Sequence, residues 1–211
     1  IKNLNLLLNS YLESYVDLFF SKKPKRRGFC YPTMNLLQTA KAALIRSNVD
    51  RRHPFRLFQL ATMGNYPEIR TVVKRKFYED YSILFYTDSR TLKVVQMKEQ
   101  KKVSAHFYHE KKKLQVRIKG QVEFIEKNTV KYRELFQEVK QSATAKDYQT
   151  TQPPGSVISS TEAITYGESF HFLPVLIKAV KIDVLQWNRE QHQRRLYILD
   201  GSKWQEQILI P

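Results

Sequence analysis

The stretch "LFYTDSRTLKVVQM", residues 84–97, changes character in its middle, and this change poses the question for the whole chain. Its first four residues have strand propensity, Asp88 and Ser89 form a turn, and a basic helical segment follows. In one interpretation Asp88 and Ser89 cap the helix, and Lys93 is solvated. In the other, hydroxyl groups, free amides and Lys93 gathered at a helix N-terminus form a phosphate site. The rest of the sequence has to decide between the two.

Composition is that of an ordinary globular chain with room for one domain. The chain has 211 residues, of which 42% are hydrophobic, and no apolar run reaches the roughly 18 residues of a membrane span. The single cysteine, Cys30, excludes an intrachain disulfide framework and a multi-cysteine zinc site. The five histidines show no metal-ligand spacing. We therefore expect a cytoplasmic protein without a metal or a membrane span.

The net charge of +16 predicts an anionic partner, such as nucleic acid, anionic lipid or a phosphorylated small molecule. Only residues 22–27, "KKPKRR", form a concentrated basic block, and many other cations alternate with apolar residues in strands, including Lys74, Lys76, Arg117 and Lys119. Such spread charge is typical of a solvated surface. Aromatic residues at a clear stacking spacing are also missing, so a nucleic-acid-binding barrel is a remote alternative.

The chain begins with Ile1, and its first part differs from the rest. Residues 3–20 fit an amphipathic helix, and the basic stretch that follows, with its Pro and Gly residues, reads as a linker. Met34 opens an apolar pattern at helical spacing and is a plausible domain start. We expect a helix and linker in residues 1–33, dispensable for folding, and one domain in residues 34–211.

Beyond residue 55 the chain has the texture of a β-protein with few helices. Short strands separated by turns indicate a mainly β fold, with one helix inserted between the third and fourth strands. This order predicts a closed antiparallel barrel rather than a βαβ sheet. The predicted strands are 55–62, 69–78, 82–87, 102–109, 114–125, 175–187, 194–199 and 204–210, and the predicted helices are 34–47, 90–100 and 129–141.

No hydrolase or nucleotide motif stands in the sequence, and His106 and His109 point to opposite faces of one strand, so they cannot share a metal. What recurs is basic residues at strand ends. Arg70 opens the strand "RTVVKR" and Arg75 closes it, while Thr87 and Lys93 flank the turn. If these groups converge at one rim of a barrel, they fit a phosphate monoester.

The order of the motifs resembles the pyridoxamine 5'-phosphate oxidase family of FMN-binding split-barrel flavoproteins, from about residue 36 to the end. The resemblance is carried by "RTVVKR" (70–75), "ILFYTDSRTLKVVQM" (83–97), "VSAHFYHEKKKLQVRIKG" (103–120) and the ending "LQWN…RRLYI…W…LIP". The stretch "DRRHPFRLFQLATM" (50–63) looks like the divergent, oxidase-related branch. The resemblance implies a homodimer with FMN bound between the subunits.

The resemblance also implies roles for individual residues. Arg70, Thr87 and Lys93 match positions that contact the FMN phosphate, and Gln115 matches a glutamine that hydrogen-bonds the flavin ring edge. Gln115 falls on the polar face of its strand, as that role requires. The other residues that match flavin-contacting positions are Thr71, Val72, Val73, Arg75, Tyr86, Trp187 and Arg195.

Three departures concern the vitamin B6 substrate rather than the flavin. Arg75 stands where the oxidases have a substrate-contacting lysine, and residues 132–148 offer no recognisable Tyr, Arg and Ser set. The oxidases end with Arg-x-His-x-Arg, whereas Gln191 and Gln193 precede Arg195 at that spacing. His192 is one position off that register. We therefore expect an FMN-dependent oxidoreductase with another substrate and unassigned catalytic residues. Authentic pyridoxamine 5'-phosphate oxidase and a non-catalytic flavin-binding module are the alternatives.

Overall fold

The computed structural model describes residues 35–189 and 191–211, so the helix and linker predicted for residues 1–33 lie outside the described residues. Among the helices of the described part, none has the length and apolar character needed to cross a bilayer. The helices are α2 (Leu36–Arg46), α3 (Leu92–Glu99) and α4 (Val130–Lys140), with 3₁₀ turns η1 (Pro54–Arg56) and η2 (Ala145–Tyr148); the strands are β1 (Leu57–Met63), β2 (Pro67–Phe77), β3 (Ile83–Asp88), β4 (Lys102–His109), β5 (Leu114–Phe124), β6 (Phe172–Gln186), β7 (Gln193–Asp200) and β8 (Lys203–Leu209).

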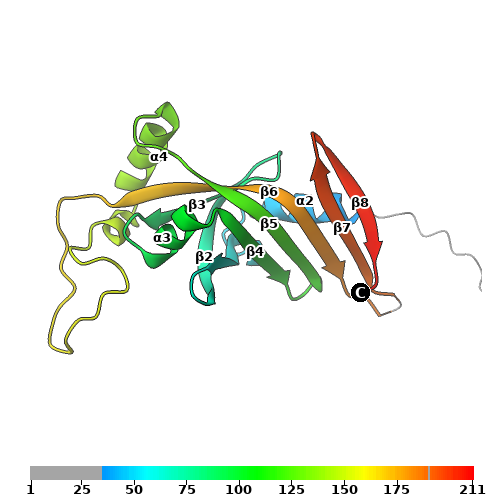
Figure 1. The fold of residues 1–211 in the computed structure, drawn as a ribbon, viewed down its shortest axis with the longest axis horizontal. Helices are drawn as coiled ribbons and strands as arrows, with labels where there is room; N and C mark the ends of the chain where they lie inside the picture. Colours follow the sequence, from blue (N-terminus) through cyan, green and yellow to red (C-terminus); the bar gives the residue numbers. More distant parts are fainter. Residues whose placement is uncertain (1–34, 190) are drawn as a thin grey trace, which may run out of the picture. The chain divides into compact units, whose positions relative to one another are not determined.

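The strands form a six-stranded antiparallel barrel with a hairpin attached to it (Figure 1). The sheet order is β3-β2-β1-β4-β5-β6-β7-β8, and an additional pairing between β3 and β6 closes the first six strands on themselves. The predicted barrel, mainly β with flanking helices, is confirmed.

Strand β6 joins the barrel to the hairpin because it pairs with two different strands along one edge. Its first half, residues 172–177, pairs with β3, and its second half, residues 181–186, pairs with β7. Strand β5 follows the other edge of β6 along both halves. In Figure 1, β6 is the long strand that runs from the α4 side of the molecule to the β7–β8 hairpin. The same strand therefore positions residues in two separate regions.

The exchange of partners on β6 coincides with an irregularity opposite Gly120. The register of the β5–β6 pair shifts between Lys119 and Gly120. A Cβ atom on Gly120 would lie 2.5 Å from the carbonyl oxygen of Lys178 and 2.6 Å from Cγ2 of Ile177. Real Cβ atoms do not approach a backbone that closely, so glycine is the residue that allows β5 to follow β6 through its bend.

Helix α2 adds one apolar face to the main core of the barrel. Asn35 caps the helix, because its Oδ1 accepts a hydrogen bond from the backbone N–H of Gln38 at 3.2 Å. Inside the barrel the rings of Phe58 and Phe107 stack with centroids 5.2 Å apart. The buried residues of α2 in this core are Leu36, Leu37, Ala40, Ala43 and Leu44.

A second, smaller core lies between α4 and the pair β3–β6. Leu84 and Phe172 supply the sheet side of this core, and Leu135 and Val139 supply the helix side. The hydroxyl of Tyr132 on α4 donates a hydrogen bond to the carbonyl of Phe172 at 3.3 Å. The segment after β5 is thus fastened against the strand that carries Thr87.

Two predicted element starts differ from the structure for local reasons. Pro54 and Phe55 form the turn η1, so the first strand begins at Leu57 instead of residue 55. The basic helix begins at Leu92 instead of Arg90, because Oδ1 of Asp88 accepts a hydrogen bond from the N–H of Arg90 at 2.8 Å and prolongs the turn.

Lys74 corrects the expectation that the strand cations are solvated, because its side chain is only 3% exposed. Its Nζ donates to Oδ1 of Asn48 at 2.6 Å, and the same oxygen accepts from the N–H of Phe77 at 2.8 Å. The register of β2 against β3 shifts between Lys74 and Lys76, so Asn48 fastens an irregular strand to the end of α2. Burial lowers the pKa of Lys74 to about 8.

Candidate functional site

The turn between β3 and α3 brings hydroxyl groups and a lysine together, as the second interpretation of residues 84–97 predicts. Nζ of Lys93 donates to Oγ1 of Thr87 at 3.3 Å, and the hydroxyl of Thr91 lies 3.3 Å from the same oxygen. Thr91 is the N-cap residue, but its hydroxyl donates to the carbonyl of Asp88 at 2.9 Å and does not cap α3. The amides of the first helical turn therefore have no side-chain cap among the described residues.

Asp88 has a different role from the helix cap considered for it. Its carboxylate accepts from Nε of Arg90 at 3.1 Å and from Nη2 at 2.7 Å. Nη2 of Arg90 also donates to the carbonyl of Thr150 at 2.8 Å, and Nη1 donates to that of Thr151 at 3.1 Å. The turn thereby anchors the loop that precedes β6. Arg90 neutralises the charge of Asp88 through this ion pair.

Arg70 on β2 lies close enough to Lys93 to affect its ionisation. Burial lowers the pKa of Lys93, the guanidinium of Arg70 lowers it further, and Asp88 acts in the opposite direction. We name Arg70, Thr87 and Lys93 the cationic cluster. It combines two cations and a hydroxyl, the donor set that suits a phosphate group.

The other predicted residues of β2 and β3 lie in different surroundings. Val72 is buried in the main core, Thr71 is exposed, and Val73 is partly buried. The guanidinium of Arg75 lies over the ring of Tyr86 at 5.2 Å, and its buried Nε has no hydrogen-bond partner among the described residues. Tyr86 packs edge-on against Phe172 at 5.0 Å, and burial raises the pKa of its hydroxyl. Arg75 and Tyr86 thus form a pair beside the second core.

Gln115 lies on the outer face of the barrel, where the alternation in its strand places it. Its Oε1 is 3.3 Å from Nε2 of His106, whose Nδ1 is 3.0 Å from Oε1 of Gln59. Gln115 pairs across the sheet with Tyr108, and the ring of Tyr108 contacts that of Trp187 with centroids 5.7 Å apart. Two predicted flavin residues, Gln115 and Trp187, are therefore joined through Tyr108.

The side chain of Arg195 points away from the sheet face that carries Gln115, whereas the side chain of the neighbouring Arg194 lies on that face. Arg195 pairs with Val184, which is fully buried, so its side chain lies on the inner face of the sheet. Arg194 pairs with Leu185, which in turn pairs with Gln115. We name the set Tyr108, Gln115, Trp187 and Arg194 the Gln115 face. Arg195 remains a predicted flavin residue, but Arg194 is the arginine that the strand register places beside Gln115.

A carboxylate that the sequence reasoning missed fixes Arg194. Asp183 accepts from Nε of Arg194 at 3.2 Å and from Nη2 at 2.9 Å, and it also forms a salt bridge with Arg117. Hydrogen bonds from these two arginines lower the pKa of Asp183 against the opposing effect of its burial. The signal was present in the sequence, because Arg117 and Asp183 occupy polar positions of neighbouring strands, but their pairing required the register.

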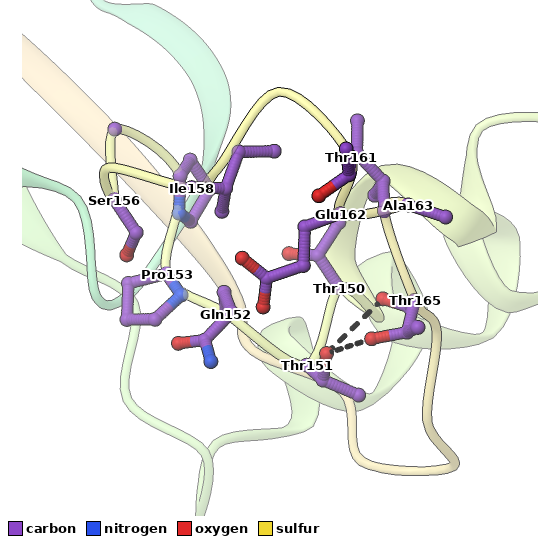
Figure 2. A pocket seen from close by; sticks show the side chains of 13 residues that line it. Thr150, Thr151, Gln152, Pro153, Ser156, Ile158, Thr161, Glu162, Ala163 and Thr165 are labelled. Carbon is purple, nitrogen blue, oxygen red and sulfur yellow. Dashed lines mark hydrogen bonds between the residues drawn. The ribbon is translucent and has the colours of Figure 1, made fainter.

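Two hollows lie away from the predicted residues. Figure 2 shows the first, about 560 Å³, which the loop of residues 150–165 encloses and which hydrogen bonds between Thr151 and Thr165 close. The second, about 430 Å³, lies between β1, β4, β5 and β6 and is lined by Lys102, Lys119 and Lys181. None of the predicted flavin residues lines either hollow. The candidate site therefore rests on the chemistry of its side chains and not on the shape of a cavity.

Comparison with known proteins agrees with the barrel fold and with the segment that carries the candidate site. The family model described as the FMN-binding domain of pyridoxamine 5'-phosphate oxidase matches residues 36–126, which contain the cationic cluster and Gln115. A search of curated proteins found no match to the chain.

Two solved structures share the fold. A pyridoxamine 5'-phosphate oxidase-related, FMN-binding protein from Nostoc punctiforme PCC 73102 is 22% identical with a TM-score of 0.65, covering 82% of this chain and 97% of its own. PhzG from Burkholderia lata 383, solved with tetrahydrophenazine-1-carboxylic acid, is 19% identical with a TM-score of 0.61, covering 83% and 88%. The closed barrel and the matched domain agree: residues 36–126 match the FMN-binding domain of the pyridoxamine 5'-phosphate oxidase family, and the fold is the split barrel of such proteins.

Proposed function

We propose that this chain binds FMN through the cationic cluster and acts as an FMN-dependent oxidoreductase. The observation that supports the proposal most directly is the contact of Lys93 with Thr87, beside an arginine that perturbs the lysine's pKa. A lysine whose pKa is lowered by a neighbouring arginine is stabilised in its charged form when a dianion lies between the two cations. A phosphate monoester supplies that charge and several acceptor oxygens.

In this proposal the cationic cluster and the Gln115 face bind different parts of FMN. Arg70, Thr87 and Lys93 hold the phosphate, while Gln115 donates to or accepts from the polar edge of the flavin ring. Bound FMN would supply the electron-transfer chemistry, and the protein would supply position and electrostatics. A flavin carrier without turnover of its own would share all these contacts, so binding and turnover need separate measurements.

Lys93→Ala tests the phosphate assignment. A charge-assisted hydrogen bond contributes about 1.5–3 kcal/mol, so we expect FMN to bind about 10- to 100-fold more weakly to this variant. Riboflavin, which lacks the phosphate, should bind within about twofold of its original affinity. Lys98→Ala is the matched control, because Lys98 is an exposed lysine on the same helix. Fluorescence titration gives both dissociation constants.

Two outcomes would contradict the assignment. If FMN and riboflavin lose affinity equally, Lys93 supports the site without contacting the phosphate. If the unaltered protein neither purifies with a flavin absorption spectrum nor binds added FMN, the proposed function itself fails.

We further propose that the physiological substrate is not a vitamin B6 phosphate. Counting back from Arg195 puts glutamines where the oxidases have Arg and His, and counting from Arg194 restores His192 but puts Glu190 in place of the arginine. In both registers a phosphate-binding cation is missing. The FMN-loaded protein should therefore oxidise pyridoxamine 5'-phosphate with kcat/KM below about 10⁴ M⁻¹s⁻¹, the lower end of the usual enzyme range. A higher value would restore the oxidase assignment.

A homodimer in a reducing, cytoplasmic compartment completes the proposal. Support comes from the outer face of β1 and β2, where Leu57, Met63 and Ile69 are about half exposed or more. Clustered apolar side chains of this kind are typical of a surface that another subunit covers. Light scattering coupled to size-exclusion chromatography should give a mass twice the chain mass of 25.1 kDa. A stable monomer would contradict the proposed dimer.

A further inference from the structure

Arg70 is held in a ring of hydrogen bonds with three residues that the sequence did not point to. Its Nη2 contacts Oε2 of Glu68 at 2.7 Å and Oε1 of Gln96 at 3.3 Å, and its Nη1 donates to the hydroxyl of Thr62. Oε1 of Gln96 accepts from Thr62 at 2.6 Å, and its Nε2 donates to Oε1 of Glu68 at 2.9 Å. The four side chains satisfy one another in a closed circuit.

This ring leaves the guanidinium little freedom. Nη1 also donates to the carbonyl of Glu68 at 3.2 Å, so the four N–H bonds of the two terminal nitrogens all have acceptors. The Nε–H and the charge are what Arg70 has left to offer a ligand. Its side chain is about one fifth exposed, so part of the guanidinium group or its stem is accessible from solvent.

Gln96 connects the two cations of the cluster. It is 4% exposed and lies one helical turn after Lys93 on α3, so the same helix carries Lys93 and fixes Arg70. The backbone makes room for it, because a Cβ atom on Gly64 would lie 2.6 Å from its Nε2. This buried amide accepts from Thr62 and Arg70 and donates to Glu68, so its loss leaves polar groups of the ring unpaired.

Glu68 has the opposite electrostatic effect on the site. Its carboxylate lies 2.7 Å from Arg70, so it cancels much of the field that Arg70 presents to another anion. Its side chain is 41% exposed, and water and salt therefore screen part of this effect. Thr62 and Gln96 still hold Arg70 when Glu68 loses its charge.

We propose that Gln96 is the positioning residue that fixes Arg70 for the flavin phosphate, and that Glu68 limits phosphate affinity as a competing internal anion. The inference rests on the proposed FMN function and adds to it a determinant of affinity. Gln96 and Glu68 belong to one ring, yet they act on the phosphate in opposite directions. A purely structural role for the ring would instead give both variants the same direction.

The test compares Gln96→Leu and Glu68→Gln in the full chain, with FMN and riboflavin as probes. Gln96→Leu should weaken FMN about tenfold, because Arg70 loses its fixed position. Glu68→Gln should tighten FMN about threefold at low ionic strength, and the gain should shrink as salt increases. Riboflavin affinity should change by less than about twofold in both variants. Glu99→Gln is the matched control, since it removes the same charge from an exposed position on α3.

Gly64→Ala provides a second way to displace Gln96 and should reproduce the weakening in Gln96→Leu. A weaker FMN complex in Glu68→Gln would overturn the competing-anion part, and equal losses of FMN and riboflavin in Gln96→Leu would overturn the positioning part. If Gln96→Leu does not fold, the Gly64→Ala result decides that part. Failure of the unaltered protein to bind FMN would instead refute the proposed function, so the two failures are distinguishable.

Discussion

The cationic cluster and the Gln115 face contain five of the eleven predicted flavin residues, and the two regions are built in different ways. In the cluster, Lys93 and Thr87 contact each other directly and come from one continuous stretch of chain. On the Gln115 face, Gln115 and Trp187 are joined through Tyr108; Gln115 lies on β5 and Trp187 directly follows β6, so α4 separates them in the sequence. The Thr87–Lys93 part of the cluster depends on a local turn, and the Gln115 face depends on strand register.

This difference teaches which kind of change should damage each region. A local turn keeps its residues together even when distant strands shift, because its geometry is set within about ten residues. A face assembled across β5, β6 and β7 loses its arrangement whenever one strand slips by a residue. The experiments below use that contrast, and they proceed from the largest expected effect to the smallest.

Gly120→Ala should give the largest effect, because it strikes the strand pair on which the Gln115 face depends. The new methyl group would overlap the backbone of Lys178, which has no alternative position within the paired sheet. We expect a loss of about 3 kcal/mol in the free energy of unfolding. Urea denaturation followed by circular dichroism measures it. Gly201→Ala is a control in open space at a turn with positive φ, and a similar loss in both would show a glycine effect unrelated to packing.

Lys74→Met should stabilise the protein, in contrast to any change at Lys93. Lys74 is buried and Lys93 is partly buried, but Lys74 contacts the amide of Asn48 and lies outside the proposed phosphate site. A pKa lowered from 10.5 to about 8 corresponds to about 3 kcal/mol, from which the lost hydrogen bond to Asn48 subtracts about 1 kcal/mol. We therefore expect a gain of about 2 kcal/mol at pH 7 by denaturant titration.

The pH dependence of this gain checks its cause. Between pH 8 and 10.5 the unfolded chain binds more protons at Lys74 than the folded chain, so the stability of the unaltered protein rises with pH in that window. The advantage of Lys74→Met should accordingly be complete below pH 8 and shrink toward pH 10.5. A constant advantage across that range would mean that packing, and not charge, causes it.

Arg194→Gln and Arg195→Gln distinguish the two faces of β7. We expect Arg194→Gln to weaken FMN and riboflavin alike, by about fivefold, because the proposed function places the ring that both ligands share against the Gln115 face. Arg195→Gln should change either affinity by less than about twofold. Titration of both ligands measures this, and the reverse ranking would return the flavin role to Arg195. Gln205→Ala, an exposed position on β8, controls for general effects on the hairpin.

Removal of residues 1–33 should have the smallest effect on either region. The family match begins at residue 36, and α2 has its own cap at Asn35. A chain beginning at Met34 should keep its melting temperature within about 2 °C and its FMN affinity within about twofold. A large fall in melting temperature would show that the N-terminal segment belongs to the core.

The sequence predicted the elements of the fold well because the side-chain alternation in its strands is regular. In β5 the even-numbered residues from Leu114 to Val122 are buried and the odd-numbered ones are not, as the sequence pattern predicts. The residues of the cationic cluster could also be picked out from the sequence, because Thr87 and Lys93 flank one turn and Arg70 begins a strand nearby in the sequence. Patterns of this short range survive folding without change.

The sequence by itself thus determined the barrel class, the strand-turn-helix unit and the identity of the two cations. Only the tertiary structure decided that Lys74 is buried, that Arg194 rather than Arg195 shares the face of Gln115, and that Glu68 and Gln96 enclose Arg70. Each of these features depends on contacts between elements that are far apart in the sequence. A strand irregularity or a one-residue shift in register moves a side chain to the other face of a sheet, and contacts between distant elements decide where that shift occurs.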